Sequence, residues 1–108
     1  MKNSFLGNWR ITEMEEWDKE YIDLVVPGYI KFDKKGMGAF QFGTVEGGID
    51  WRLEENEKTE RIEFSWEGNN DTDSACGRGW AIKKGGNLNG RLYIHLGDDS
   101  GFTAIRQK

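Results

Sequence analysis

The side chains with the clearest catalytic potential are the single histidine, His95, and the carboxylates expected around it. An imidazole beside an acid is a common general base, so such a pair would suit a hydrolase-type reaction. The acids expected nearest to it are Asp98, Asp99, Asp71 and Glu13. We nevertheless expect His95 to be an exposed, inert side chain. The spacing of the residues does not match a serine, histidine and acid triad, and the sequence has no second histidine that could bind a metal ion together with His95. An enzyme is therefore the least favoured of three functions.

The segment around Cys76 offers two further chemical possibilities. The thiol lies two residues before Arg78, but no histidine or second cysteine adjoins it in the sequence, so an unreactive thiol is expected. The letters DTDS at 71–74 match the beginning of a calcium-binding loop. The match then ends, because Ala75 and Cys76 replace the expected acid and glycine, and Ile82 replaces the terminal glutamate. No metal and no cofactor is predicted.

The composition indicates one acidic domain spanning residues 1–108. The chain has a formal net charge of -4 and a pI of about 5.0, so it repels phosphates and nucleic acid is not an expected partner. No apolar run is long enough for a signal peptide or a membrane span. The single cysteine cannot form an internal disulfide, which agrees with a reducing compartment. We expect a soluble, cytoplasmic protein without membrane contact.

Apolar residues alternate with polar ones along most of the chain, and this period of two is typical of strands with one buried face. Eight stretches have the pattern: 9–12, 30–33, 40–42, 49–54, 61–67, 80–82, 88–96 and 102–107. The alternation directs nine large aromatic side chains inward: Trp9, Phe32, Phe40, Phe42, Trp51, Phe64, Trp66, Trp80 and Phe102. It also directs Ile82 and Leu96 inward. The predicted core is aromatic.

Short glycine-containing segments at 33–36, 83–87 and 97–101 suit hairpin turns, so consecutive strands should be antiparallel. The exception is a predicted helix over 15–25, where apolar residues recur at helical spacing, Thr12 and Glu15 fit a capping box, and Pro27 ends the helix. Closure of eight such strands removes exposed edges. We predict a mainly β protein, an eight-stranded antiparallel up-and-down β-barrel with one short helix between the first and second strands. A two-sheet sandwich and an open sheet packed on the helix are the alternatives.

The first and last strands carry a family resemblance. The triplet GNW at 7–9 and an arginine in the final FTAIRQK segment are similar to the calycin superfamily, which includes the lipocalins and the fatty-acid-binding proteins. In that family the tryptophan plugs the closed end of the barrel and the arginine packs across it. The resemblance therefore implies that Trp9 and Arg106 meet at the closed end as a structural plug.

The predicted topology divides the loops and their charges between two ends. The turns at 33–37, 54–60 and 83–88 belong to the closed end, and the longer segments at 15–27, 43–48, 67–79 and 97–101 belong to the open end. Cations expected at the closed end are Lys34, Lys35, Lys58, Arg61, Lys83, Lys84 and Lys108, diluted by Asp33, Glu54, Glu55, Glu57 and Glu60. Acids expected at or near the open end are Glu13, Glu15, Glu16, Asp18, Glu20, Asp23, Glu46, Asp50, Glu67, Asp71, Asp73, Asp98 and Asp99. Such an end would repel anions and favour a cationic or neutral ligand or a basic protein surface.

Two non-enzymatic functions remain. The favoured one is a protein-interaction or structural domain with an aromatic-filled interior and an acidic open end. The alternative is a carrier that binds a small neutral or cationic apolar molecule at the barrel mouth. Candidate ligand-binding residues at that mouth are Trp17, Phe42, Trp66, Trp80, His95 and Phe102. The identity of the ligand or partner and the oligomeric state stay open.

Overall fold

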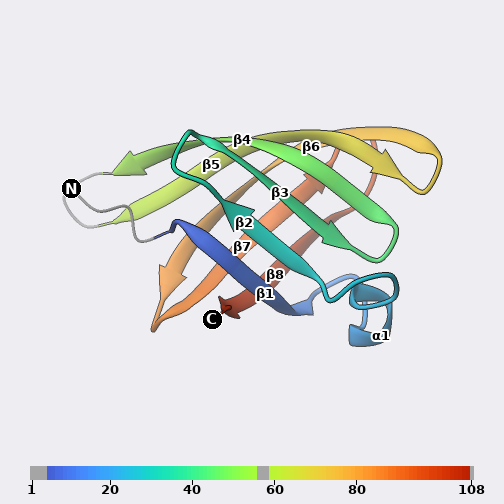
Figure 1. Ribbon diagram of the computed structural model, residues 1–108, viewed down its shortest axis with the longest axis horizontal. Coiled ribbons are helices and arrows are strands. Elements are labelled where there is room, and N and C mark those ends of the chain that lie inside the picture. Colours follow the sequence, from blue (N-terminus) through green and yellow to red (C-terminus); the bar gives the residue numbers. More distant parts are fainter. Residues whose placement is uncertain (1–4, 56–58, 108) are drawn as a thin grey trace.

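The computed structural model describes residues 5–55 and 59–107 and has eight antiparallel strands that close into a barrel (Figure 1). The elements are β1 (Gly7–Met14), α1 (Lys19–Ile22), β2 (Tyr29–Phe32), β3 (Met37–Phe42), β4 (Val45–Glu55), β5 (Glu60–Asn70), β6 (Asp73–Lys84), β7 (Asn87–Ile94) and β8 (Asp99–Arg106). Each strand pairs with the next, and β1 pairs with β8 to close the barrel. The predicted fold class is confirmed, and the sandwich and the open sheet are excluded.

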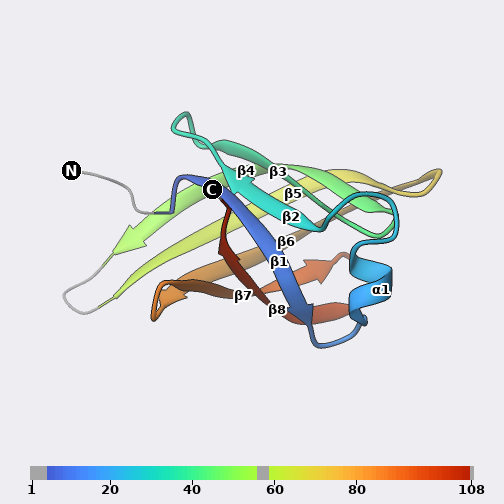
Figure 2. The ribbon, with the colours of Figure 1, turned by 60° about the horizontal axis from the view of Figure 1, so that its bottom comes forward.

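The barrel is elongated and its two ends differ. Its principal extents are 40 × 23 × 21 Å. The single short helix α1 lies beside the end at which β1 finishes (Figure 2). We call this the open end, and it also holds the β3–β4, β5–β6 and β7–β8 turns. The β2–β3 and β6–β7 turns lie at the opposite, closed end, as the alternating strand directions require.

Side chains of the protein itself fill the inside of the barrel. Trp51, Phe64 and Trp66 are buried, whereas their neighbours Arg52 and Ser65 are exposed, so the predicted alternation holds along β4 and β5. The aromatic rings contact one another across the interior: Phe32 with Phe64, Phe32 with Trp51, Phe40 with Trp66, and Phe40 with Phe42, at centroid separations of 5.0 to 6.2 Å. Such contacts add about 0.5 to 1.5 kcal/mol per pair to the effect of burial.

The predicted inward orientation of Trp80, Ile82 and Leu96 is wrong. On β6 the buried positions are Gly79 and Ala81, and the Trp80 ring lies on the outer surface with the Arg61 guanidinium 4.8 Å from its centroid. The physical reason is lack of space, because a Cβ atom on Gly79 would lie 2.4 Å from Cζ of Phe64. Leu96 is 95 % exposed, since it belongs to the β7–β8 turn and has a positive φ of 61°.

The helix is shorter than the predicted 15–25. α1 covers only Lys19–Ile22, and its cap is Asp18, whose carboxylate accepts a hydrogen bond from the Tyr21 N–H at 3.0 Å. The predicted capping box does not form, because Thr12 lies within β1 and its hydroxyl donates to the Thr103 carbonyl at 3.2 Å. Pairing of β1 with β8 therefore takes the predicted capping residue Thr12 into the barrel wall, and the helix begins only at Lys19.

Two segments predicted as open-end loops are strands. Residues 45–48 begin β4, and residues 67–70 and 73–79 belong to β5 and β6. The turn between β5 and β6 contains only Asp71 and Thr72, and Asp71 adopts a positive φ of 59°. Tight turns of this kind favour Asp and Asn in the left-handed region. The segment that includes Cys76 and Arg78 is thus part of the barrel wall.

The segment after α1 is fastened to β1 by one carboxylate. Asp23 accepts hydrogen bonds from the Gly28 N–H at 2.8 Å, from the Arg10 guanidinium at 2.8 Å and from Lys19 Nζ at 3.3 Å. The Gly28 N–H lowers the pKa of Asp23 most, and the two cations add to this effect against partial burial. The carboxylate therefore favours its charged form in the folded protein.

Replacing Asp23 with alanine is expected to lower the free energy of unfolding at neutral pH by about 1 to 2 kcal/mol, because three donors lose a charged acceptor. The folded-state pKa lies below the ordinary 3.8, so this stabilisation is complete above that value and disappears as the pH falls through the lowered pKa. Denaturant titrations from neutral to acid pH should show that the free energy of unfolding falls less steeply with pH in the variant than in the wild type. Asp98→Ala, at an exposed position, is the control. If the free energy of unfolding of Asp23→Ala fell with pH as steeply as that of the wild type, this role of the carboxylate would be contradicted.

Candidate functional site

A hollow of about 880 Å³ lies on the outer face of strands β4 to β7. We call this hollow the outer groove. Its lining combines the polar side chains of Ser65, Glu67, Cys76, Arg78, Tyr93 and His95 with the apolar side chains of Met37, Ile49 and Trp66. Its volume falls within the usual range of small-molecule sites, about 300 to 1,000 Å³. The groove is on the outside of the barrel wall and is separated from the interior by the buried side chains beneath it.

The strand register arranges the groove side chains in two neighbouring rows. In the first row Ser65 of β5 is paired with Arg78 of β6, which is paired with Tyr93 of β7. In the second row Glu67 is paired with Cys76, and the His95 N–H donates to the Cys76 carbonyl at 2.7 Å. Directly opposed residues have Cβ atoms about 4.5 to 5.5 Å apart. Residues as far apart in the sequence as Ser65 and His95, which are 30 positions apart, thus lie on one surface.

Small residues produce the hollow. Gly48 of β4 is paired with Glu67 and has no side chain to occupy the surface, and a Cβ atom there would have only the Glu67 carbonyl oxygen within reach, at 3.9 Å. The small side chains of Ser65 and Cys76 extend the floor of the hollow across β5 and β6. Longer side chains such as Arg78 form its rim. The depth of the groove therefore follows from side-chain size.

Buried Trp66 supports the groove from below. Its indole Nε1 donates to the Tyr93 carbonyl oxygen at 3.1 Å and so links β5 to β7 beneath β6. Gly77 makes this contact possible, because a Cβ atom there would lie 2.9 Å from the indole nitrogen and 1.8 Å from the Tyr93 oxygen. The strands that form the floor of the groove are thus joined both by the sheet and by this side chain.

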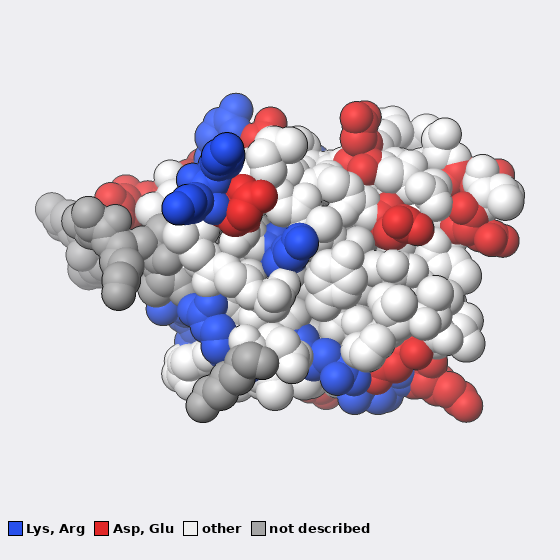
Figure 3. All heavy atoms as spheres, in the orientation of Figure 1, with Lys and Arg blue, Asp and Glu red and all other residues white. Residues whose placement is uncertain are grey.

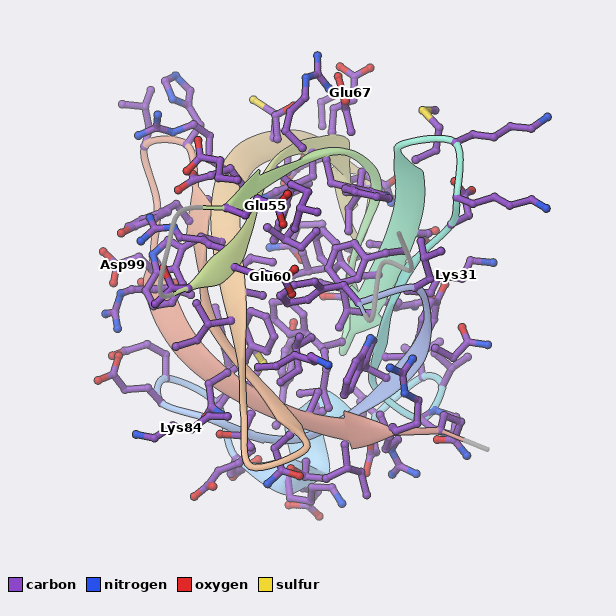
Figure 4. The ribbon with its side chains drawn as sticks, turned by 90° about the vertical axis from the view of Figure 1, so that its left-hand side faces the viewer. Lys31, Glu55, Glu60, Glu67, Lys84 and Asp99 are labelled. Atoms are coloured by element: carbon purple, nitrogen blue, oxygen red, sulfur yellow. The ribbon has the colours of Figure 1, made fainter. Side chains whose placement is uncertain are left out.

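The charges in the groove include two that have no ion-pair partner. Asp50 at the edge of the groove is neutralised by Arg52. By contrast, among the described residues neither Arg78 nor Glu67 takes part in an ion pair. Glu67 projects outward from the barrel (Figure 4). The groove thus presents one cation and one anion that are free to contact a bound molecule.

The six predicted ligand-binding residues lie in three places and do not form one site. Trp17 packs against Phe42 at the open end, with ring centroids 4.8 Å apart. Trp66 and His95 line the outer groove. Trp80 and Phe102 line a smaller surface hollow of about 360 Å³ beside β1.

The acids predicted to assist His95 are also dispersed. Glu13 lines the smaller hollow, and Asp99 pairs with Arg91 at 2.7 Å. Of the residues that share a surface with His95, Cys76 and Arg78 were assigned by the sequence to the loop at 67–79, and Glu67 to the boundary between that loop and the strand at 61–67. The alternation of Gly77 and Gly79 with Cys76, Arg78 and Trp80 is the signal that could have identified a strand there, with its glycines facing inward.

The closed end has the arrangement that the family resemblance implied. Trp9 is 1 % exposed, and the Arg106 guanidinium lies over its ring, 4.1 Å from the centroid. Trp9 Nε1 donates to the Phe5 carbonyl at 2.9 Å, and Arg106 donates to the Leu6 carbonyl. The two residues are directly opposed in the β1–β8 pairing. The predicted contact between Trp9 and Arg106 is confirmed.

These features define a small closed antiparallel β-barrel with an aromatic interior and a groove on its outer wall that carries both charged and apolar side chains. Comparison of the chain with protein-family models, curated proteins and solved structures finds no match. Within residues 5–55 and 59–107, no helix has the length and apolar character needed to cross a membrane. The same ranges contain no group of three or more His, Cys, Asp or Glu side chains that could hold a metal ion.

Proposed function

We propose that this protein is a non-enzymatic interaction domain that binds its partner on the outside of the barrel, with the acidic open end directed at a basic protein surface. The observation that carries this proposal is the filled interior. Phe32, Phe40 and Phe42 are each at most 1 % exposed, and neighbouring rings contact them from several strands. An eight-stranded barrel has room for side chains or for one small ligand, and here side chains occupy it.

The charges at the open end support a basic partner. The exposed or half-buried acids in its turns and adjoining strand ends are Glu13, Glu15, Glu16, Asp18, Glu20, Asp23, Glu46, Asp71, Asp73, Asp98 and Asp99. Arg10, Lys19 and Arg91 offset only part of this charge, through ion pairs with Asp23, Glu15 and Asp99. An excess of one sign steers an oppositely charged partner and aligns it.

The closed end has a different charge pattern. Lys34 and Lys35 lie in the β2–β3 turn and Lys83 and Lys84 at the end of β6, together with Asp33 and Glu54. In Figure 3 acids predominate toward the end that carries α1 and the β5–β6 turn, whereas Lys and Arg lie among acids toward the other end. Lys58, Lys108, Glu57 and part of the 54–60 turn, which the sequence assigned to this end, lie outside the described residues.

Capture of proteins from lysate of the native cells should test the open end. The triple variant Asp71→Asn, Asp73→Asn, Asp98→Asn removes three exposed acids there, and asparagine tolerates the positive φ at position 71. We expect a partner held by the wild type to bind about tenfold more weakly or worse to this variant, and in a salt-dependent manner. The control Glu54→Gln, Glu55→Gln, Glu60→Gln makes the same charge change at the closed end. Equal effects of the two triple variants on partner binding would contradict the proposal.

The second candidate is a carrier, favoured by the aromatic contact at the open end. Trp17 is only half-buried and packs on Phe42 and Tyr21, so an apolar molecule could contact its free face. Native mass spectrometry of protein purified from its own cells distinguishes the two functions. An unliganded mass is expected for the interaction domain, and a retained small molecule that is lost in Trp17→Ala would favour the carrier.

A further inference from the structure

The outer groove combines features that suit a small ligand of a particular charge pattern. Arg78 and Glu67 are the two groups there without an ion-pair partner among the described residues. They lie on adjacent strands, since Arg78 is paired with Ser65 and Glu67 follows Ser65 by two residues on the same face. Diagonal neighbours of this kind are about 7 to 8 Å apart. This distance separates the bases of the two side chains, and both side chains are long, so their charged ends can lie on either side of a small molecule.

Each of the two charged groups selects a different part of a ligand. The planar guanidinium of Arg78 can bind a carboxylate through two parallel hydrogen bonds. The carboxylate of Glu67 accepts hydrogen bonds only, so it selects an ammonium or another donor. The hydroxyls of Ser65 and Tyr93 border Arg78 in the same row and can complete the hydrogen bonding.

We propose that the outer groove binds a small zwitterion that carries a carboxylate and an ammonium group close together, as a free amino acid does. The carboxylate contacts Arg78, the ammonium contacts Glu67, and the side chain of the ligand lies over Gly48, where the surface of β4 is open. The ligand has no net charge, so the acidic character of the chain as a whole does not repel it.

Competition from a direct contact between Arg78 and Glu67 is weak. An exposed ion pair contributes at most about 1 kcal/mol, because water solvates both charges well. A zwitterion satisfies both groups at once and has little conformational freedom to lose. The contacts of the ligand with the two exposed groups are limited in the same way, so its expected dissociation constant is about millimolar.

Titration of isotope-labelled protein with individual amino acids, followed by backbone amide chemical shifts, tests the proposal directly. At least one amino acid at millimolar concentration should shift the amides of Ser65, Glu67, Cys76 and Arg78. Its carboxamide and its N-acetyl derivative, which each lack one of the two charges, should bind about tenfold more weakly or worse. Absence of shifts in the groove with every standard amino acid, or equal binding by either derivative, would overturn the proposal.

Charge variants assign each contact. Arg78→Gln should weaken binding of the amino acid about tenfold but leave binding of the carboxamide nearly unchanged. Glu67→Gln should likewise weaken binding of the amino acid about tenfold but leave binding of the N-acetyl derivative nearly unchanged. Lys31→Gln and Glu60→Gln are the matched controls, because both residues are exposed and lie outside the groove (Figure 4). Binding that is unaffected by Arg78→Gln and Glu67→Gln, or equally weakened by the controls, would contradict the assignment.

A steric variant tests the position of the ligand without changing any charge. Gly48→Val places a side chain in the open part of the groove, and nothing lies closer than 3.9 Å to its Cβ atom. The variant should fold, because valine favours strands, and should lose binding. Gly101→Val on β8 is the matched control, since its Cβ atom also has only ordinary contacts, at 3.5 Å or more. Retention of binding by folded Gly48→Val would place the ligand elsewhere and overturn the proposal.

Discussion

Replacing Phe64 with alanine will lower the free energy of unfolding by about 3 to 5 kcal/mol. Phe64 is 5 % exposed, and its ring packs against Phe32 with centroids 6.1 Å apart. It also occupies the space above Gly79, so the variant leaves a cavity next to a residue that has no side chain to fill it. The strands around the cavity are hydrogen-bonded on both sides and cannot collapse into it.

Denaturant unfolding followed by circular dichroism measures this loss, and Ser65→Ala is its control. Ser65 is the next residue on β5 and faces outward, so its truncation should change stability by no more than about 0.5 kcal/mol. A loss below about 1 kcal/mol for Phe64→Ala would place the ring at the surface. The register of β5 would then be shifted by one residue, which reverses every side chain on the strand.

Trp9→Ala is expected to destabilise the barrel by a similar amount, about 3 to 5 kcal/mol. The indole is 1 % exposed, its N–H donates to the Phe5 carbonyl at 2.9 Å, and Arg106 covers its face at 4.1 Å. Alanine removes the packing, the hydrogen bond and the cation–π contact together. The closed end then admits water to the aromatic core.

Two milder changes separate these contributions. Trp9→Phe keeps most of the ring but loses the N–H, and should cost about 1 to 2 kcal/mol because the Phe5 carbonyl loses its donor. A double-mutant cycle between Trp9→Leu and Arg106→Gln should give a coupling of about 0.5 to 1 kcal/mol. Zero coupling would show that Arg106 covers Trp9 without an energetic interaction, and a loss below about 1 kcal/mol for Trp9→Ala would refute the plug.

The local pattern of the sequence was sufficient for the fold class and for most of the core. A period of two in side-chain polarity depends only on neighbouring residues, so the alternation of Phe64 and Trp66 with Ser65 could be identified without knowledge of any partner strand. Short turns between such strands imply antiparallel neighbours, and closure removes the edges. The division of the turns between the two ends of the barrel follows from the same strand order. Asp50 and Glu67, which the sequence placed at or near the open end, instead lie along the barrel wall, where both line the outer groove.

The orientation of β6 and the extent of the helix depended on contacts distant in the sequence. Tryptophan is a residue type that is often buried, which favoured an inward Trp80. Phe64 already fills the space on the inner face of β6, however, so only Gly79 and Ala81 fit there. Thr12 could cap a helix locally, but hydrogen bonds to β8 stabilise it in a strand instead. In both places packing and sheet pairing outweigh a local preference.

The outer groove was decided by tertiary structure alone. The sequence identified His95, Cys76 and Arg78 one by one, and it gave no reason to join them to Glu67, because their separations match no known motif. Their proximity follows from the register of the β5–β6 and β6–β7 pairs, which is determined by tight turns and by the core beneath the strands. Side-chain alternation determines which face of a strand a residue occupies, whereas only the register of the paired strands determines which residues it meets on that face.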